Sequence, residues 1–303
     1  MRGARLIRYH PDHNDNGVGR AGGKGSFEMQ FRVLKPMLAA AVVALVAAYP
    51  AAGQSVSRTP ERIDGKPNLN GIWQAMSTAH WNLEAHAAAP LPKFWRLGAI
   101  AAIPAGQSVV DGDGKIPYKP EALAKRTENQ AGWPRTDPEA ACYLPGIPRA
   151  NYMPYPFQIV QGDTDMDIMF IYSYAAANRA VHMTDIRTLD EVPVDLWMGW
   201  SNGRWDGDTL VVETIANDDR TWFDRAGNYH SNQMVVTERF TLLDRNRMQY
   251  EATIDDPEVF TRPWTISMIL YKDTAPNAEL LEFKCVEFSE PLLYGEWLKQ
   301  PLE

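Results

Sequence analysis

Several features that define common classes of protein are missing from this 303-residue chain. It has only two cysteines, and no Cys-x-x-Cys spacing points to a zinc site. The absence of Gly-x-Ser-x-Gly, phosphate-loop and dinucleotide-binding motifs removes support for serine hydrolase, nucleotide and NAD chemistry. From these missing motifs we expect neither a metal nor an organic cofactor. Positive charge is also in deficit, with 30 Lys or Arg against 38 Asp or Glu.

The chain also lacks an apolar run that would cross a bilayer comfortably, because the run before Pro50 covers about a dozen residues. Residues 37–53 instead have the order of a secretory signal peptide, with basic residues first, then an apolar core, then a small-residue cleavage site ahead of Gln54. A retained N-terminal anchor is the alternative. Under this interpretation the polar, Gly-rich residues before Met29 form a leader, and translation begins at Met29 or Met37.

Cleavage makes the remaining chain more acidic. Residues 1–53 contribute +4 to the total charge of −8, so the mature chain carries −12. A strongly acidic protein repels phosphate backbones and anionic membrane surfaces. We expect a periplasmic or secreted protein that binds no nucleic acid and has no stable membrane insertion after cleavage.

The two cysteines, Cys142 and Cys285, belong to a chain directed to an oxidising compartment. A pair in that setting usually forms a disulfide, and this is our prediction. Two buried free thiols, or one reactive thiol, are the alternatives.

Proline dominates the first part of the mature chain. Of the 22 prolines, eleven lie between Pro90 and Pro156. Proline removes a backbone donor and restricts the residue before it, so long strands and helices cannot persist there. A short helix starting at Pro120 is possible. We interpret residues 54–156 as a first strand followed by an irregular arm, packed down by Trp81, Trp95 and Trp133.

From residue 157 onward the pattern is that of strands, and residues 157–303 form the predicted barrel. Met248, Tyr250 and Ile254 alternate with polar neighbours, as in a half-buried strand. The predicted strands are 69–74, 157–161, 166–174, 179–184, 198–205, 209–216, 234–243, 247–255, 264–272 and 279–287.

Short links between these strands favour antiparallel neighbours. Eight or nine such strands usually close into a barrel, because closure removes exposed edges. The sequence therefore predicts a mainly β protein in which an antiparallel meander closes into a barrel. A β-sandwich is the alternative.

The strand at residues 69–74 contains Gly71 and Trp73. This pair resembles the Gly-x-Trp opening strand of lipocalins, in which the tryptophan plugs the closed end of the barrel. The resemblance implies a lipocalin-like barrel with room for one small ligand.

Two longer motifs resemble a large group of mostly uncharacterised exported bacterial proteins. They are GRWDGDTLVVET at residues 203–214 and DDPEVFTRPW at residues 255–264. The segments CYLPGIPR at 142–149 and LEFKC at 281–285 belong to the same likeness. It implies that both cysteines are part of the framework, and it assigns no substrate.

His182 is the first candidate catalytic residue, because Asp185 follows closely and a carboxylate beside an imidazole suits acid–base chemistry. Arg179 and Arg187 flank it and could hold an anionic oxygen. The alternative is a half-buried histidine beside a salt bridge.

His230 precedes a predicted strand and could face the mouth of the barrel, although a solvated loop position is equally compatible with the sequence. Glu238 alternates with Met234, Val236 and Phe240 on what we predict to be the inner face. A buried carboxylate must find a partner or stay protonated, and such residues gather at functional sites. A structural pair with a neighbouring arginine is the alternative.

We therefore predict an exported barrel enzyme of the lyase, hydratase, isomerase or cyclase type, acting without a cofactor on a small hydrophobic or aromatic molecule. A binding or carrier protein without turnover, and a structural envelope protein, are the competing hypotheses. The predicted catalytic residues are His182, Asp185, His230 and Glu238, and the predicted substrate-binding residues are Arg179, Arg187, Tyr172, Tyr250 and Trp264.

Overall fold

A computed structural model describes residues 59–91 and 102–287 of the chain. The described residues all belong to one compact unit. The predicted leader, the signal peptide and Trp95 lie outside the described residues.

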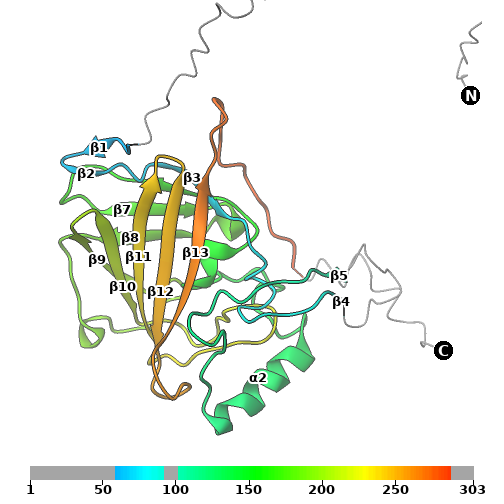
Figure 1. Ribbon diagram of the computed structural model, residues 1–303. Coiled ribbons are helices and arrows are strands. Elements are labelled where there is room, and N and C mark those ends of the chain that lie inside the picture. Colours follow the sequence, from blue (N-terminus) through cyan, green and yellow to red (C-terminus); the bar gives the residue numbers. More distant parts are fainter. Residues whose placement is uncertain (1–58, 92–101, 288–303) are drawn as a thin grey trace, which may run out of the picture. The chain divides into compact units, whose positions relative to one another are not determined.

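Nine strands close into a barrel, which confirms the predicted mainly β fold and removes the sandwich alternative (Figure 1). Around the barrel the strand order is β10-β11-β12-β13-β3-β6-β7-β8-β9, and β9 pairs with β10 to complete the circle. The strands are β3 (Gly71–Ala75), β6 (Phe157–Val160), β7 (Ile168–Tyr172), β8 (Asn178–His182), β9 (Trp200–Asp206), β10 (Thr209–Ile215), β11 (Val235–Asp244), β12 (Arg247–Asp255) and β13 (Trp264–Lys272).

The predicted alternation sets the inner face of the barrel. Along β12 the residues Met248, Tyr250, Ala252 and Ile254 are all fully buried, while their neighbours are exposed or half-buried. Successive side chains of a strand point to opposite faces, so this pattern requires one face to lie against a core. Glu238 of β11 follows the same rule and is fully buried, as predicted.

Strand β3 closes the barrel although it is far from its neighbours in sequence, because it pairs with both β13 and β6. The Lys272 ammonium lies 5.6 Å from the centre of the Trp73 ring and donates a hydrogen bond to the Asn70 carbonyl at 2.5 Å. Gly71 has φ of +145°, and a Cβ atom there would come within 2.3 Å of the lysine side chain. The Gly-x-Trp pair thus gives Lys272 room to cross β3 and cover the tryptophan.

One pairing differs from the predicted meander, since β8 and β9 run parallel. Parallel neighbours need a crossover of a dozen or more residues. Residues 183–199 provide it, and they include the short 3₁₀ turn η4 (Leu189–Glu191). The barrel is therefore mixed rather than fully antiparallel.

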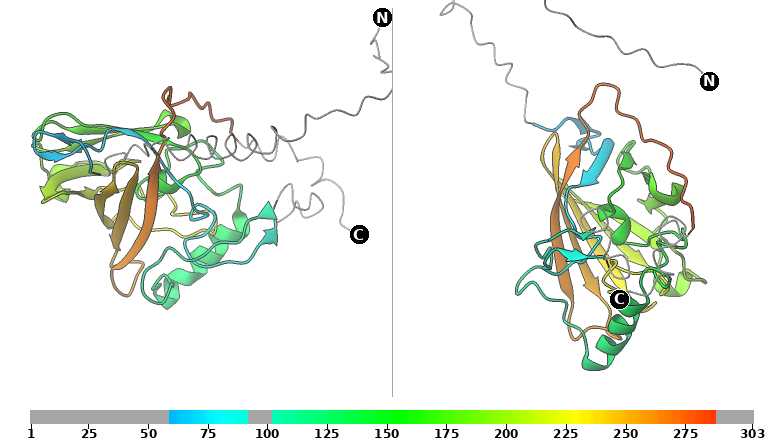
Figure 2. Two further views of the ribbon diagram at one scale, coloured as in Figure 1. Left: turned by 45° about the horizontal axis from the view of Figure 1, so that its top comes forward. Right: turned by 90° about the vertical axis from the view of Figure 1, so that its right-hand side faces the viewer.

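The predicted strand at 279–287 is wrong. These residues form no strand, because the edge of β13 on that side is already paired with β3. Residues 273–287 instead form an extended segment, called the strap here, that leaves the end of β13 and runs down beside the barrel (Figure 2). The strap ends at the disulfide between Cys142 and Cys285, whose Cα atoms are 5.7 Å apart, so the predicted disulfide is confirmed.

The proline-rich arm is attached to the barrel by isolated bridges, Val110 with Ile266 and Tyr118 with Phe260. Its one described α-helix starts at Pro120 as predicted, since proline suits the first helical position. The minor elements are β1 (Arg62–Ile63), β2 (Lys66–Pro67), β4 (Ala89–Pro90), β5 (Ala102–Ile103), α2 (Pro120–Gly132), η2 (Arg149–Tyr152) and η3 (Tyr174–Ala176).

The arm also enters the barrel. Asn151 and Tyr152 of η2 are fully buried, and the Asn151 amide donates to the Glu238 carboxylate at 2.6 Å. The Tyr250 hydroxyl donates to the same carboxylate oxygen at 2.9 Å, and the Tyr172 hydroxyl donates to the side-chain oxygen Oδ1 of Asn151 at 2.8 Å. Side chains of β7, β11 and β12 and of the arm thus form one hydrogen-bonded network around a buried carboxylate.

Arg179 of β8 neutralises this carboxylate. Its guanidinium forms an ion pair with Glu238 and donates to Ser201 at 2.7 Å and to Thr214 at 2.6 Å. Burial of a charge is tolerated only when it is paired and hydrogen-bonded, as it is here. The side chains of this network, with Phe157, Phe170 and Phe240 around it, occupy the interior, so the space expected for a ligand is filled.

We predict that removing one partner of this pair destabilises the protein much more than removing both. Glu238→Leu leaves the Arg179 charge buried alone and should lower the free energy of unfolding by about 3–5 kcal/mol. The double variant Glu238→Leu with Arg179→Met should lose less than the single variant. Urea unfolding of the wild type and the two variants checks this, and a loss in the double variant as large as that in Glu238→Leu would contradict it.

Candidate functional site

The predicted catalytic histidines occupy different surroundings. His182 is half-buried on the outer side of β8, where Nδ1 lies 2.9 Å from the Asp167 carboxylate and its ring stacks on Trp200 at 4.1 Å. Arg187 lies 3.9 Å from the same tryptophan ring and pairs with Asp185. The structure therefore brings three predicted residues into one cluster, organised by a tryptophan that the sequence had not singled out.

His230 is buried in the loop before β11. Its Nδ1 lies 2.8 Å from the Ser231 carbonyl and its Nε2 lies 2.6 Å from the Thr221 hydroxyl. The carbonyl can only accept, so Nδ1 carries the proton, and in the neutral ring Nε2 is an unprotonated acceptor beside the Thr221 hydroxyl. Burial lowers the pKa of His230, which favours this neutral form.

The predicted residues thus divide into separate groups. Tyr172, Arg179 and Tyr250 gather around Glu238 inside the barrel, while Trp264 packs on Phe223 and Phe260. In the described part of the chain, neither His182 nor His230 hydrogen-bonds to Glu238 or to the other histidine. Acid–base catalysis needs its groups around one reacting atom, and these contacts do not provide such a grouping.

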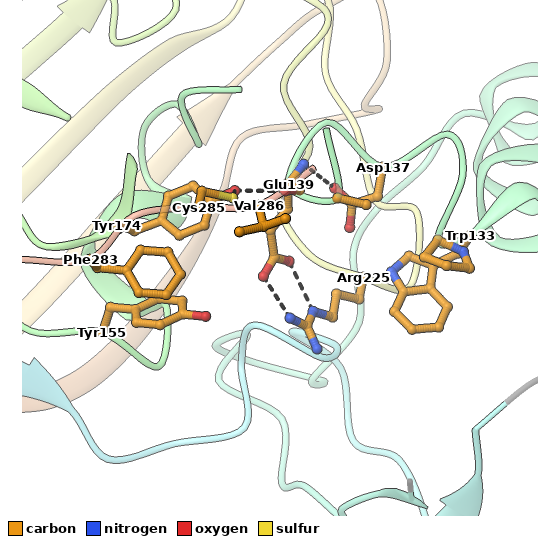
Figure 3. Close-up of a pocket in the computed structure, with 11 residues that line it drawn as sticks. Trp133, Asp137, Glu139, Tyr155, Tyr174, Arg225, Phe283, Cys285 and Val286 are labelled. Atoms are coloured by element: carbon orange, nitrogen blue, oxygen red, sulfur yellow. Dashed lines mark hydrogen bonds and ion pairs between the residues drawn. The ribbon is translucent and has the colours of Figure 1, made fainter. Parts of the chain in front are cut away.

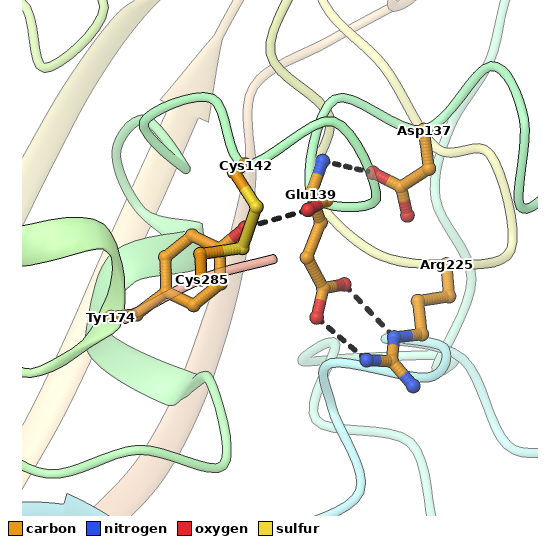
Figure 4. The surroundings of a disulfide bond; sticks show 6 residues. All are labelled: Asp137, Glu139, Cys142, Tyr174, Arg225 and Cys285. Carbon is orange, nitrogen blue, oxygen red and sulfur yellow. Dashed lines mark hydrogen bonds and ion pairs between the residues drawn. A yellow bond between two sulfur atoms is a disulfide. The ribbon is translucent and has the colours of Figure 1, made fainter. Parts of the chain in front are cut away.

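A second buried ion cluster, missed by the sequence analysis, lies in the arm beside the disulfide. Arg149 is buried and contacts Asp137 at 2.8 Å and Glu139 at 2.6 Å. Arg225, from the loop after β10, binds Glu139 through two nitrogens at 2.6 and 2.9 Å (Figure 4). Asp137, Glu139 and Arg149 closely surround Cys142 in sequence, which was the one available signal.

The electrostatics of this cluster fix its protonation. Burial alone would raise the pKa of Glu139, but the Arg225 and Arg149 guanidiniums lower it to about 2. Burial, followed by the charge of Arg225, lowers the pKa of His80 to about 4. Glu139 is therefore ionised and His80 neutral near pH 7, so neither group is suited to exchange protons there.

The strap borders three pockets. The smallest, about 80 Å³, lies between the Glu139–Arg225 pair and the rings of Tyr155, Tyr174 and Phe283 (Figure 3). We call it the tether pocket, because Cys285 forms part of its wall.

The second pocket, called the rim pocket here, has a volume of about 540 Å³ and lies where β3 and β13 meet under the strap. Its walls include Met76, Tyr271, Leu281 and Phe283, and Trp73 lies fully buried behind them. A volume of roughly 300–1,000 Å³ is typical of sites for small molecules. The rim pocket therefore has the size and apolar walls of such a site.

The third pocket, about 570 Å³, lies on the other side of the strap and is called the outer pocket. Ser173, Leu281, Glu282 and Phe283 line both it and the rim pocket, so the strap separates the two. The strap also forms part of the wall of the tether pocket. Release of the strap would therefore open all three.

Charged groups at the rim pocket are unevenly distributed. Lys272 lines it together with the carboxylates Asp273, Glu279 and Glu282. Burial lowers the pKa of Lys272, and its ammonium is already held by the Asn70 carbonyl and the Trp73 ring. The charge around the pocket is therefore negative, which favours a neutral or cationic ligand over an anionic one.

Comparison with protein-family models, with curated proteins and with solved structures finds no match for this chain. The likeness to exported bacterial proteins therefore stays a prediction. Its two motifs form the β9–β10 hairpin and the connection from β12 to β13. Among the described residues, no helix has the length and apolarity needed to cross a membrane.

The lowered pKa of His80 predicts an acid-sensitive contribution to stability. The unfolded chain binds a proton at His80 near pH 6.5, whereas the folded protein binds it only near pH 4. Stability should therefore fall as the pH drops from 6.5 to 4, by at most about 3 kcal/mol. His80→Gln removes this titration, so its unfolding free energy should depend less on pH in that window. Equal pH dependence in both proteins would contradict this assignment.

Proposed function

We propose that the protein is exported and binds a small, neutral or cationic, apolar or aromatic molecule in the rim pocket. The single observation that carries the proposal is a pocket of about 540 Å³ with aromatic and aliphatic walls under a covalently attached strap. Its role would be that of a carrier or sequestering protein.

The filled interior of the barrel supports this location. The network around Glu238 occupies the centre of the barrel, where a lipocalin-like protein would hold its ligand. Trp73 is fully buried between that interior and the rim pocket. A ligand is therefore expected outside the closed end rather than inside the barrel.

Binding is better supported than the lyase or isomerase type of chemistry predicted from the sequence. The predicted acid–base residues His182, His230 and Glu238 do not line the rim pocket. A catalytic acid or base needs to lie within hydrogen-bond reach of the substrate. Catalysis stays the second hypothesis, with the Glu238 network and the His182 cluster as its candidate groups in the described part of the chain.

Export to the periplasm or the medium is supported by the disulfide, which suggests an oxidising environment outside the cytosol. Expression of the full sequence in a bacterium should yield a periplasmic or secreted protein that starts at Gln54. Intact mass and N-terminal sequencing check this. A cytoplasmic product that retains residues 37–53 would contradict it.

Phe283→Ala tests the proposed pocket, because this half-buried ring lines it and belongs to the strap rather than to the core. Titration with the neutral apolar dye Nile red should show saturable binding to the wild-type protein. The dissociation constant should rise about fivefold or more in Phe283→Ala, which corresponds to roughly 1 kcal/mol.

Leu243→Ala is the matched control, because Leu243 is an exposed hydrophobic residue of β11 and does not line the rim pocket. It should bind Nile red as the wild type does, and both variants should keep the wild-type melting temperature. Equal loss of binding in both variants, or no saturable binding to the wild type, would contradict the proposal.

A further inference from the structure

Few noncovalent contacts hold the strap in place. Within residues 273–287 the structure has no helix or strand. The Ser173 hydroxyl donates to the Leu281 carbonyl at 3.0 Å. The Phe283 ring lies 4.6 Å from Tyr155 and 5.7 Å from Tyr174, measured between ring centres. Most of the strap is otherwise exposed, so the disulfide is its main attachment to the barrel.

The disulfide is placed where a small reagent can reach it. Cys142 and Cys285 are both only half-buried. Both line the outer pocket, and Cys285 also lines the tether pocket. Thiol–disulfide exchange requires this kind of access to a sulfur atom.

The backbone at the fixed end of the disulfide is strained. Cys142 has φ of +58°, in the left-handed region that residues other than glycine rarely adopt. Such conformations persist only when their surroundings enforce them, and they gather at ligand clamps and switch regions. This position therefore differs from an ordinary structural cross-link in a relaxed loop.

We propose that the Cys142–Cys285 disulfide is a redox latch that keeps the strap closed over the rim pocket. This inference rests on the proposed function, because it adds regulation to the same binding site. In the oxidised protein the strap is fixed at Lys272, where β13 ends, and at Cys285, so Leu281 and Phe283 stay against the ligand. Reduction frees the second end.

The chemical step is an exchange with an external dithiol. One thiolate of the dithiol attacks a sulfur of the disulfide and forms a mixed disulfide, releasing one protein thiolate. The second thiol of the reagent then attacks the mixed disulfide. This step releases the other protein thiolate, and the reagent departs as a cyclic disulfide. The protein gains two electrons and two protons as two thiols, and the reagent is oxidised by the same amount.

Opening follows from how far apart the two cysteines lie in sequence. They are separated by 143 residues, so nothing in the local chain keeps them together once the bond is broken. The ring contacts of Phe283, the Ser173–Leu281 hydrogen bond and the hydrogen bond from the Asp273 N–H to the Ile72 carbonyl then compete with the conformational entropy of a free strap. The rim pocket loses the wall that Leu281 and Phe283 provide, and it merges with the outer pocket.

The test uses the folded, oxidised mature protein with bound Nile red, treated with dithiothreitol. Reduction should raise the dissociation constant of the dye at least tenfold, and reoxidation should restore it. In parallel, trypsin should cleave after Lys284 in the strap at least ten times faster in the reduced protein. Cleavage after Lys115, an exposed residue of the arm, should not change.

The possible outcomes separate the two proposals. If the oxidised protein binds no dye, the proposed function fails and the rate of cleavage after Lys284 alone decides whether the latch exists. If the dye binds equally before and after reduction and the cleavage rate is unchanged, the latch is wrong while the binding function stands.

Near-ultraviolet circular dichroism must show that the barrel survives reduction, because loss of its signal would assign the disulfide to the fold and overturn the latch.

The oxidised Phe283→Ala protein provides a comparison with the covalent attachment intact. It should remain as resistant to cleavage after Lys284 as the wild type within about twofold. Rapid cleavage of this oxidised variant would show that the ring contacts, and not the disulfide, close the strap.

Discussion

The ion pair between Glu238 and Arg179 is the constraint on which the rest of the structure depends. A carboxylate and a guanidinium at the centre of a barrel must be paired and hydrogen-bonded, because the interior offers little solvation. The required partners come from several strands and, through Asn151, from the proline-rich arm. The arm therefore completes the interior of the barrel, and the interior is filled by protein rather than by a ligand.

Filling the interior moves the candidate binding site to the outside of the barrel. There β3, which is inserted between β13 and β6, and the strap, which leaves β13, enclose the rim pocket. The disulfide links the far end of the strap to the same arm that supplies Asn151. One segment of the chain thus completes the interior through η2 and fixes the strap through Cys142.

Much of the fold could be predicted from local patterns. Alternating residues such as those of β12 identify strands because burial on one face leaves a period of two. The same rule placed Glu238 inside, and a pair of cysteines in a chain with an export signal predicted the disulfide. The helix at Pro120 follows from the preference of proline for the first turn.

What could not be predicted depends on contacts between distant parts of the chain. The residues at 279–287 look like a strand, but only the pairing of β3 with β13 shows that no edge is left for them. The parallel pairing of β8 with β9 has no local signature. Asn151 gives no sign in sequence that it reaches Glu238, so the filled interior and the position of the pocket could not be foreseen.

The central claim is that a ligand binds under the strap and not inside the barrel, and photoaffinity labelling tests it most directly. A small neutral aromatic diazirine, irradiated with the oxidised protein and located by peptide mass spectrometry, should label Met76, Leu281 or Phe283 at the rim pocket. An excess of Nile red should suppress that labelling. Labelling at Tyr172 or Tyr250 in the interior, or around Trp200 on the outer face, would contradict the account.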